Sequence, residues 1–470
     1  MALAHHPEHQ PVELDLAALE GALRGRIILP ADAEYEEARH VHNLAVEKHP
    51  LAIIQAADTA DVALVVDVAR ETGLDLAIRG GGHSLAGYGT VDGGLVLDLS
   101  QMRGLHIDPE RRLAWAQPGI TAGEYSAAAA AHGLATPFGD APSVGVAGLT
   151  LGGGIGWLVR KYGLTIDALV SAEVVTADGR VVTASADENP DLFWAIRGGG
   201  GNFGVITRFV FRLYPVGMVV GGALFLPPTR EALAALVPTA KAAPAELTTI
   251  AFLMPIMPAP FIPEPLVGQP ALVIMYVWCG ELDQADAALA PFRALAEPLA
   301  DLSMPMPYPG IYEFTKQASA PSREIVRSMF LDELDDEVVD TMLARVATMP
   351  ATGSITQIRV ISGAMGETDT SATAFSHRER QVLLALITPF TEGDDAPIDW
   401  TKAYFEELRP KALGVYSNFL EAEGNARIRE AYPTGTFERL REVKRSWDPG
   451  NLFRLNQNIP PAAPARVVQA

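Results

Sequence analysis

Residues 79–87 have the sequence Arg-Gly-Gly-Gly-His-Ser-Leu-Ala-Gly and directly follow Leu74–Ile78, an apolar run that has the character of a buried strand. Three consecutive glycines after a strand let the backbone adopt positive φ angles and turn several N–H groups toward one anion. A pyrophosphate is a natural guest for such a loop. The stretch therefore predicts an anion-binding turn at the end of a strand, and a plain tight turn is the alternative.

Better-known glycine loops fit these residues less well. A Walker loop ends in Gly-Lys-Ser/Thr, and the chain contains no Gly-Lys dipeptide. A Rossmann fingerprint opens a helix, whereas Tyr88–Gly94 is a glycine-rich turn that leads into a strand. A hydrolase nucleophile elbow also leads into a helix, and Gly82–Ala86 departs from Gly-x-Ser-x-Gly at its last residue.

Two further glycine-rich segments follow. Residues 139–163 contain closely spaced glycines, a density that lets the backbone approach a large planar ligand. Arg197–Gly204 contains four consecutive glycines and is another loop suited to an anion. A tightly packed glycine-rich core is the alternative interpretation, and it is less attractive because each ordered glycine carries an additional entropy cost.

Composition limits the class of protein. A chain of 470 residues with 49% hydrophobic residues suggests two to three domains, and its formal charge of −21 disfavours nucleic acid and anionic membranes as partners. Cys279 is the only cysteine, which excludes an internal disulfide and cysteine-rich zinc sites. Ala141–Val159 is uncharged and nearly long enough to span a membrane, but its glycines predict buried backbone instead. Without a signal pattern near the N-terminus, we expect a cytoplasmic protein.

The order of secondary-structure patterns predicts two domains. Up to Tyr214-Pro215, short apolar runs alternate with helical patterns such as Thr59–Thr72, and Asp178-Gly179 marks a hairpin. Beyond that point glycines become rarer, and long apolar strands such as Ala271–Trp278 alternate with alanine-rich helices. Glycine- and asparagine-rich sequence returns near the C-terminus. We therefore predict that residues 216–414 form a domain inserted into a domain made of residues 1–215 and 415–470.

Taken together, these segments resemble the vanillyl-alcohol-oxidase superfamily and, within it, the berberine-bridge-enzyme-like FAD-linked oxidases of the singly histidine-linked bacterial type. The resemblance implies an α+β fold, in which a two-subdomain PCMH-type FAD-binding domain carries an inserted antiparallel-sheet substrate domain backed by helices. The matching pieces extend across nearly the whole chain in the family's order: RGGGHSLAG (79–87), GVAGLTLGGGIGWLVRKYGLTID (145–167), VVTADG (174–179), NPDLFWAIRGGGGNFGVIT (189–207), YSNF (416–419) and DPGNLFRLNQNIPP (448–461).

The resemblance implies that His83 is bonded to the 8α-methyl group of FAD; a histidine merely hydrogen-bonded beside the flavin is the alternative. Ala141 stands where many relatives carry a cysteine that forms a second link, so a single attachment is implied. Val144 falls where the family controls the access of oxygen. The residues implied to hold FAD are Arg79, Gly80, Gly81, Gly82, His83, Ser84, Gly87, Gly139, Ser143, Val144, Gly145, Gly148, Gly152, Gly153, Gly156, Val205, Tyr416, Asn418, Asn456 and Asn458.

Tyr416 matches a tyrosine that commonly serves as the catalytic base of the family. Its unperturbed pKa would be about 10, so a cation or flavin contacts must lower it for action near neutrality. A core tyrosine hydrogen-bonded to the flavin is the alternative. Gln357 is the second catalytic candidate, because it is the nearest counterpart of an acidic residue in polyketide-pathway relatives. Phe252 stands where a tyrosine can occur, so we expect a comparatively apolar pocket.

Two other groups of residues are expected to be bystanders. Thr373–Phe375 and Arg378 match a Thr-Ala-Phe/Tyr-x-x-Arg stretch of the family, which we interpret as a structural cap. His40 and His42 lie four or six residues after Glu36, but nothing nearby completes a metal site. We therefore expect these histidines at the surface, and no metal.

The function implied by the resemblance is that of an FAD-linked oxidase. It would take a hydride from a small alcohol, amine, sugar or secondary metabolite to flavin N5, and molecular oxygen would reoxidise the flavin and release hydrogen peroxide. The alternatives are a flavin dehydrogenase with another acceptor, or an oxygenating enzyme of a polyketide-type pathway. A flavin-binding module without turnover is the non-enzymatic alternative. The substrate and the oligomeric state stay open.

Overall fold

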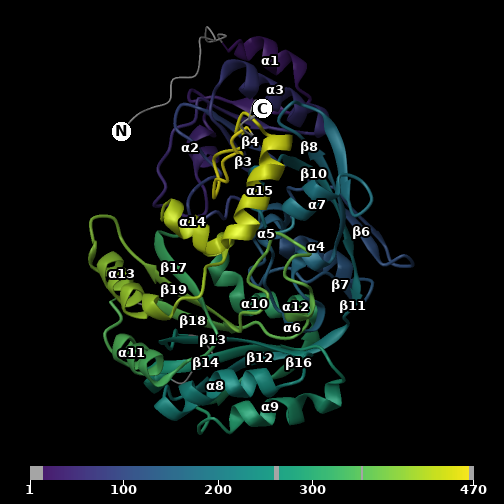
Figure 1. Ribbon diagram of the computed structural model, residues 1–470. Helices are drawn as coiled ribbons and strands as arrows, with labels where there is room; N and C mark the ends of the chain where they lie inside the picture. Colours follow the sequence, from purple (N-terminus) through teal and green to yellow (C-terminus); the bar gives the residue numbers. More distant parts are fainter. Residues whose placement is uncertain (1–13, 259–263, 351–352, 465–470) are drawn as a thin grey trace, which may run out of the picture.

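The chain folds into two parts that lie one above the other in Figure 1. The computed structural model describes residues 14–258, 264–350 and 353–464. The upper part contains two small sheets and the C-terminal helices, and the lower part is built on one large sheet. The ends of the two predicted FAD-domain segments, residues 1–13 and 465–470, lie outside the described residues.

A four-stranded sheet places the first glycine loop. Its strand order is β1-β2-β4-β3, and β4 runs parallel to both β2 and β3. Helix α3 (Thr59–Thr72), which the periodicity of the sequence predicts, connects β2 to β3; it begins at the Asp58 cap, and its buried side includes Val62, Val65 and Val66. The loop starts at Arg79, the last residue of β3. The strands are β1 (Arg26–Ile28), β2 (Ala52–Gln55), β3 (Leu76–Arg79) and β4 (Leu95–Asp98).

A five-stranded antiparallel sheet supports the second and third glycine-rich segments. Its order is β5-β6-β10-β8-β9, and the predicted hairpin at Asp178-Gly179 joins β8 to β9. Helix α4 (Ala122–Ala130), which begins with a Thr121/Glu124 capping box, and α7 (Pro190–Ala195) pack on the core of this sheet. The strands are β5 (Leu105–Asp108), β6 (Leu113–Ala116), β8 (Leu169–Val175), β9 (Val181–Ser185) and β10 (Val205–Arg212).

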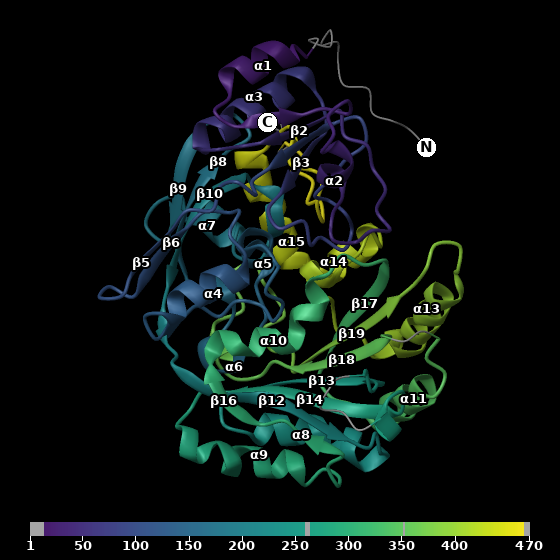
Figure 2. The same cartoon turned by 180° about the vertical axis from the view of Figure 1, so that it is seen from behind.

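The lower part is an eight-stranded antiparallel sheet, and all of its strands fall within the segment predicted as the inserted domain. Helices α8, α9, α11 and α13 cover its outer face, as Figures 1 and 2 show. The predicted α+β fold with an inserted antiparallel sheet is confirmed. The elements are β12 (Met218–Leu226), β13 (Leu247–Pro255), β14 (Pro270–Trp278), β15 (Ala300–Asp301), β16 (Met304–Pro307), β17 (Glu324–Leu331), β18 (Ile355–Val360), β19 (Val382–Pro389), α8 (Arg230–Ala242), α9 (Ala285–Arg293), α11 (Asp336–Val346) and α13 (Ala396–Leu408).

After the inserted sheet, the chain returns to the upper part through α14 (Asn425–Ala431) and α15 (Thr434–Trp447), drawn in yellow in Figures 1 and 2. Lys444 of α15 is fully buried and donates hydrogen bonds to the carbonyl oxygens of Asn202 (2.6 Å) and Phe453 (2.9 Å). Its partner is the buried Asp448 carboxylate, 2.7 Å away. This buried pair fixes the C-terminal segment against the third glycine-rich loop.

Two short strands mark the junction between the two parts. Strand β11, which consists of Tyr214–Pro215, pairs with β7 at this junction. Beyond this dipeptide glycines become rarer in the sequence.

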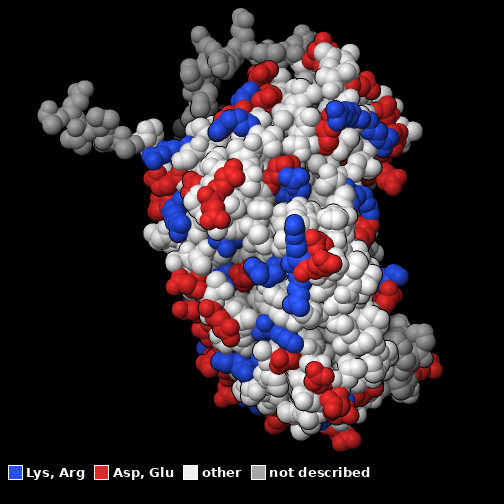
Figure 3. Space-filling view, turned by 90° about the vertical axis from the view of Figure 1, so that its right-hand side faces the viewer, with Lys and Arg blue, Asp and Glu red and all other residues white. Residues whose placement is uncertain are grey.

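On the face shown in Figure 3, most basic side chains have acidic neighbours. Among the described residues, no helix combines the length and apolar character needed to cross a membrane. The short elements are α1 (Leu16–Ala22), α2 (Tyr35–Arg39), α5 (Val146–Gly152), α6 (Val159–Tyr162), α10 (Tyr312–Thr315), α12 (Ala364–Glu367), β7 (Leu134–Ala135) and β11 (Tyr214–Pro215).

Candidate active site

A cavity of about 400 Å³ lies where the sheets and the C-terminal segment meet. Its walls come from the four-stranded sheet (Ile78), the five-stranded sheet (Val205), the inserted sheet (Gln357) and the C-terminal segment (Tyr416). The predicted site residues that line it are Arg79, Gly80, Gly81, Gly82, His83, Ser84, Gly139, Val144, Gly145, Gly148, Val205, Gln357, Tyr416, Asn418 and Asn456. Most of the residues singled out in the sequence therefore converge on one site.

The first glycine loop is shaped by close approach more than by unusual φ angles. Of its three consecutive glycines, Gly82 alone has a positive φ, of 71°, so the prediction of positive angles along the loop is wrong for the other two. A Cβ atom on Gly81 would lie 2.4 Å from the backbone nitrogen of Gly145, and one on Gly145 would lie 2.5 Å from that of Gly81. The two loops thus touch backbone to backbone, which excludes any side chain at either position.

Four of the predicted cofactor glycines stand behind the cavity wall and do not line it. A Cβ atom on Gly87 would meet Val46, and one on Gly156 would lie 1.8 Å from the carbonyl oxygen of Phe138. Gly153 faces Phe375, with which a Cβ atom would collide at 2.8 Å. The fourth, Gly152, faces a side chain of the C-terminal segment. The structure therefore gives these four glycines a packing role that shapes the site indirectly.

His83 is held in a defined orientation. Its Nε2 atom lies 3.0 Å from Ser143 Oγ, which explains why Ser143 does not line the cavity: its hydroxyl is occupied by the histidine. The ring of His42 stacks on that of His83, with centroids 4.0 Å apart. Burial, with a smaller contribution from His42, lowers the pKa of His83 to about 3. The imidazole is therefore neutral at physiological pH and keeps a lone pair for bonding.

The expected surface position of His42 is wrong. This side chain is half-buried and lines the cavity, because its backbone N–H donates to the carbonyl of Gly82 (3.0 Å) and aligns the two segments. Burial lowers the pKa of His42 as well. The His-x-His pattern gave no indication of this position, since the stacking partner is brought in by tertiary structure.

Tyr416 is buried and its hydroxyl oxygen accepts two hydrogen bonds, from Gly154 N–H and from the Asn418 side-chain amide, each 2.9 Å long. Asn418 also donates to the carbonyl of Leu149 (3.1 Å), which fixes the orientation of its amide. Burial raises the pKa of Tyr416 to about 12, against the opposing effect of the two donors and of Arg359. N–H donors favour the phenolate, so these contacts offset part of the cost that burial imposes on ionisation of Tyr416.

The wall near Tyr416 carries charged side chains, although most of the cavity lining is apolar, in agreement with the expectation of a comparatively apolar pocket. Arg359 is 4% exposed and donates from its two terminal nitrogens to Asp140, at 2.9 and 3.0 Å. Its Nε donates to the Gln357 side-chain oxygen at 2.8 Å, so Gln357 serves as an acceptor in the cavity wall. Glu324 also lines the cavity. The alternation of strand residues from Gln357 could have identified Arg359; its pairing with Asp140 depends on tertiary contact.

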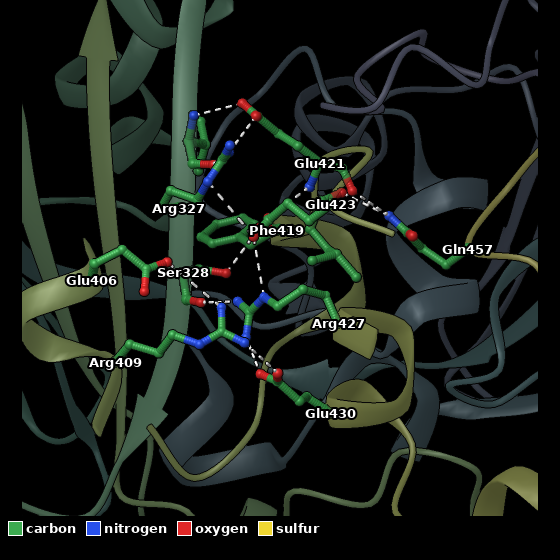
Figure 4. A network of polar contacts seen from close by, with 12 residues as sticks. Arg327, Ser328, Glu406, Arg409, Phe419, Glu421, Glu423, Arg427, Glu430 and Gln457 are labelled. Atoms are coloured by element: carbon green, nitrogen blue, oxygen red, sulfur yellow. Dashed lines mark hydrogen bonds and ion pairs between the residues drawn. The ribbon is translucent and has the colours of Figure 1, made fainter. Parts of the chain in front are cut away.

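The loop that carries Tyr416 is clamped between β17 and the C-terminal tail (Figure 4). The carbonyl of Phe419 accepts a hydrogen bond from Ser328 Oγ (2.8 Å). The carboxylate of Glu421 accepts from Arg327 Nη1 at 2.5 Å. Gln457 donates to the carbonyl of Leu420, at 2.7 Å. Both parts of the protein therefore hold the position of this loop.

The predicted cap residues pack behind the tyrosine. Arg378 is 1% exposed and donates to Asp167 (2.7 Å) and Thr373 (2.9 Å), while the ring of Phe375 lies edge-on to Tyr416 with centroids 6.0 Å apart. None of the cap residues lines the cavity, in agreement with a structural role. Phe252 pairs with Gln357 across neighbouring strands but is packed in the core away from the cavity.

The cavity suits a flavin nucleotide on observations of the protein alone. The close contact between Gly81 and Gly145 shapes a loop that can present its backbone N–H groups to a phosphate. Asn456 lines the cavity with a buried side-chain oxygen that has no protein donor among the described residues, so a ligand N–H could satisfy it. Asn458 has a similar buried oxygen but does not line the cavity. Ala141 lines the cavity with a methyl group, which cannot form a covalent link.

Two family models match the chain. The model described as FAD binding domain matches residues 50–185, and the model described as berberine and berberine like matches residues 415–460. These matches cover the loops at His83 and Val144 and the C-terminal segment from Tyr416 onward.

Similar proteins extend over nearly the whole chain. (R)-6-hydroxynicotine oxidase of Paenarthrobacter nicotinovorans is 30% identical over 456 residues, which are 94% of this chain and 97% of that protein. An FAD-linked oxidoreductase of Bacillus subtilis named YvdP is 30% identical over 94% of this chain and 99% of its own. The crystal structure of 6-hydroxy-D-nicotine oxidase from Arthrobacter nicotinovorans superposes with a TM-score of 0.83 at 26% identity, over 94% of this chain and 98% of that one.

Gly81→Ala should strip flavin from the protein. The added methyl group would lie 2.4 Å from Gly145 N, so the two loops must separate. We expect the flavin content of the purified protein to fall about tenfold. A modest free-energy cost of overpacking is enough to weaken binding by that factor. The ratio of visible to ultraviolet absorbance measures this content. Gly435→Ala, where a Cβ atom meets nothing within 4 Å, is the control; full flavin content in the Gly81 variant would contradict the proposed role of the contact.

Proposed function

Because the chain belongs to the berberine-bridge-enzyme-like FAD-linked oxidoreductases, we propose that it is an oxidase of a small organic substrate with FAD bonded to His83. The substrate, an alcohol, amine, sugar or secondary metabolite, loses a hydride and a proton. Dioxygen receives the two electrons and leaves as hydrogen peroxide. The observation that carries the proposal is the convergence of a neutral, oriented His83 and a buried Tyr416 on one cavity.

The protein's own residues divide the work along the cavity. Gly81 and Gly82 would hold the pyrophosphate of FAD, and Asn456 would satisfy an N–H group of the cofactor. FAD, when bound, supplies the hydride acceptor and passes the electrons to dioxygen. Val144 lines the cavity as a small side chain that leaves room for oxygen. A relative named as a nicotine oxidase supports oxidase chemistry at such a site.

His83 is suited to form a single covalent bond with the cofactor. Ser143 holds one ring nitrogen, and stacking against His42 restrains the plane of the ring. The low pKa of His83 leaves the imidazole unprotonated, and an unprotonated nitrogen is required for nucleophilic attack. Since Ala141 supplies no sulfur, a second link is excluded at that position.

Tyr416 would take the proton of the substrate. Its phenol oxygen is the point at which Gly154 N–H and the Asn418 amide converge, and both contacts stabilise the charge that develops on proton loss. The clamp on the following loop keeps this oxygen in the cavity. Asn418 thus acts through the tyrosine as a positioning residue.

His83→Ala should abolish acid-stable flavin. The wild-type protein should remain yellow after acid precipitation, and the variant should release all of its FAD. Because the pKa of His83 is about 3, the imidazole loses no further proton between pH 5 and pH 8, so the yield of covalent attachment should be flat across that range. Intact mass measures attachment, with exposed His106→Ala as the control. Acid-stable colour in the His83 variant would disprove the link.

Mixing reduced protein with air-saturated buffer tests the choice of dioxygen as acceptor. Stopped-flow absorbance should show fast return of the oxidised flavin spectrum and one hydrogen peroxide per flavin. Slow return would instead identify a dehydrogenase that uses another acceptor, and labelled oxygen in the organic product would identify an oxygenating enzyme.

Asn418→Ala should shift the pH dependence of catalysis. Loss of an N–H donor destabilises the phenolate, which raises the pKa of Tyr416, so the ascending limb of the pH–rate profile should move to higher pH by about one unit. Tyr416→Phe should lower the rate about 100-fold or more. Anaerobic bleaching of the flavin by a substrate found in a panel of alcohols, amines and sugars gives both rates. Exposed Asn425→Ala is the matched control; an unmoved profile would remove Asn418 from this role.

A further inference from the structure

Two neighbouring side chains of β18 give the cavity wall a polarity that is not explained by holding a flavin. Gln357 and Arg359 are two residues apart on one strand and so point to the same face of the sheet. Both line the cavity, and they are 5% and 4% exposed. Their shared face meets the second glycine-rich segment, where Arg359 pairs with Asp140.

The amide of Gln357 is oriented with its donors toward the cavity. Its oxygen accepts the hydrogen bond from Arg359 Nε at 2.8 Å, so the amide nitrogen must be directed elsewhere. Among the described residues, no protein acceptor bonds that nitrogen. Two N–H groups of Gln357 are therefore available to an acceptor atom of a ligand.

The guanidinium of Arg359 also keeps donors free. Three of its five N–H groups serve Gln357 and Asp140, which leaves two. The group lies over the ring of Phe419, 5.0 Å from its centroid, and that ring is 5.5 Å from the ring of Tyr416. The ring of Phe419 thus separates the guanidinium from the proposed base, and both Arg359 and Tyr416 are buried.

Glu324 supplies another carboxyl group of the cavity wall, and it lies far from Gln357 along the sheet. Glu324 pairs with Pro389 across β17 and β19, whereas Gln357 pairs with Ala385 across β18 and β19. Four residues along the strand and two strands across separate their backbones by about 16 Å, from the usual sheet spacings. Near Tyr416 the carboxylate of Asp140 is the available negative charge, and Arg359 bonds both of its oxygens.

We propose that Gln357 and Arg359 select a substrate that carries a carboxylate beside its oxidisable hydroxyl group, and that they disfavour protonated amines. The carboxylate would accept from the Gln357 amide and the free guanidinium N–H groups, while the hydroxyl faces Tyr416. Oxidation would convert the C–H and O–H of the alcohol into a carbonyl: the hydride would pass to FAD, Tyr416 would accept the proton, and dioxygen would take up the two electrons and two protons and leave as hydrogen peroxide. This assignment of substrate class rests on the proposed oxidase function.

Binding of inert probes tests the selection separately from turnover. Isothermal titration calorimetry on the purified holoprotein, at pH 7 and without oxygen, compares benzoate with benzylamine, which have similar shape and opposite charge. We expect benzoate to bind at least about tenfold more tightly, the advantage of a charge-assisted bidentate contact. Arg359→Gln should remove that advantage, and Arg359→Lys should retain part of it. Arg230→Gln, which alters a surface ion pair of the same domain, should match the wild type.

Gln357→Leu provides a second variant that keeps the Arg359–Asp140 pair and removes the amide of Gln357, both its donors and the oxygen that accepts from Arg359 Nε, so the result does not depend on the folding of the Arg359 variant. It should weaken benzoate severalfold and leave benzylamine unchanged. Equal or tighter binding of benzylamine by the wild type, or a ratio unaltered in both the Arg359→Gln and Gln357→Leu variants, would overturn the proposal. Absence of hydrogen peroxide during aerobic turnover would instead contradict the oxidase function, because the binding ratio is measured on the holoprotein without oxygen.

Discussion

The contact between the backbones of Gly81 and Gly145 is the constraint on which the site depends. With a hypothetical Cβ atom only 2.4 Å from the facing nitrogen, neither position can carry a side chain. The contact brings the loop that ends in His83 against the loop that carries Ser143, and so allows the 3.0 Å contact between their side chains. It also sets Ala141 and Val144 on the cavity wall. The chemistry at the histidine is therefore a consequence of two chain segments meeting without side chains between them.

The second requirement is that the inserted sheet and the returning C-terminus meet over the same cavity. Tyr416 follows the inserted domain directly, and its loop bonds to β17 on one side and to Gln457 on the other. Lys444 then ties the returning helix to the third glycine-rich loop. Because the two contacts with β17 cross between the two parts, the position of the tyrosine oxygen depends on their relative placement. A structural change in either part would displace that oxygen atom.

Burial shifts the pKa values of the two reactive side chains in opposite directions. Burial keeps His83 neutral, which suits a nitrogen that must donate an electron pair. Burial also opposes ionisation of Tyr416, and the N–H donors of Gly154 and Asn418 act against that cost. Arg359 contributes in the same direction while remaining paired with Asp140. Arg359 can thus favour both the phenolate and an anionic substrate.

The amino-acid sequence determined the α+β class, the inserted domain and the family, because glycine loops and strand patterns are local features whose order along the chain is itself informative. It also singled out His83, Tyr416 and Asn418. It also indicated a comparatively apolar pocket, but it missed the roles of His42, Arg359 and Asp140. Those features arise where segments distant in the chain come together: Arg359 and Asp140 are 219 positions apart, and neither is unusual in its own strand or loop. Local sequence patterns indicate which residues can bind a cofactor. Only the tertiary structure decides which charged side chains face one another across the cavity.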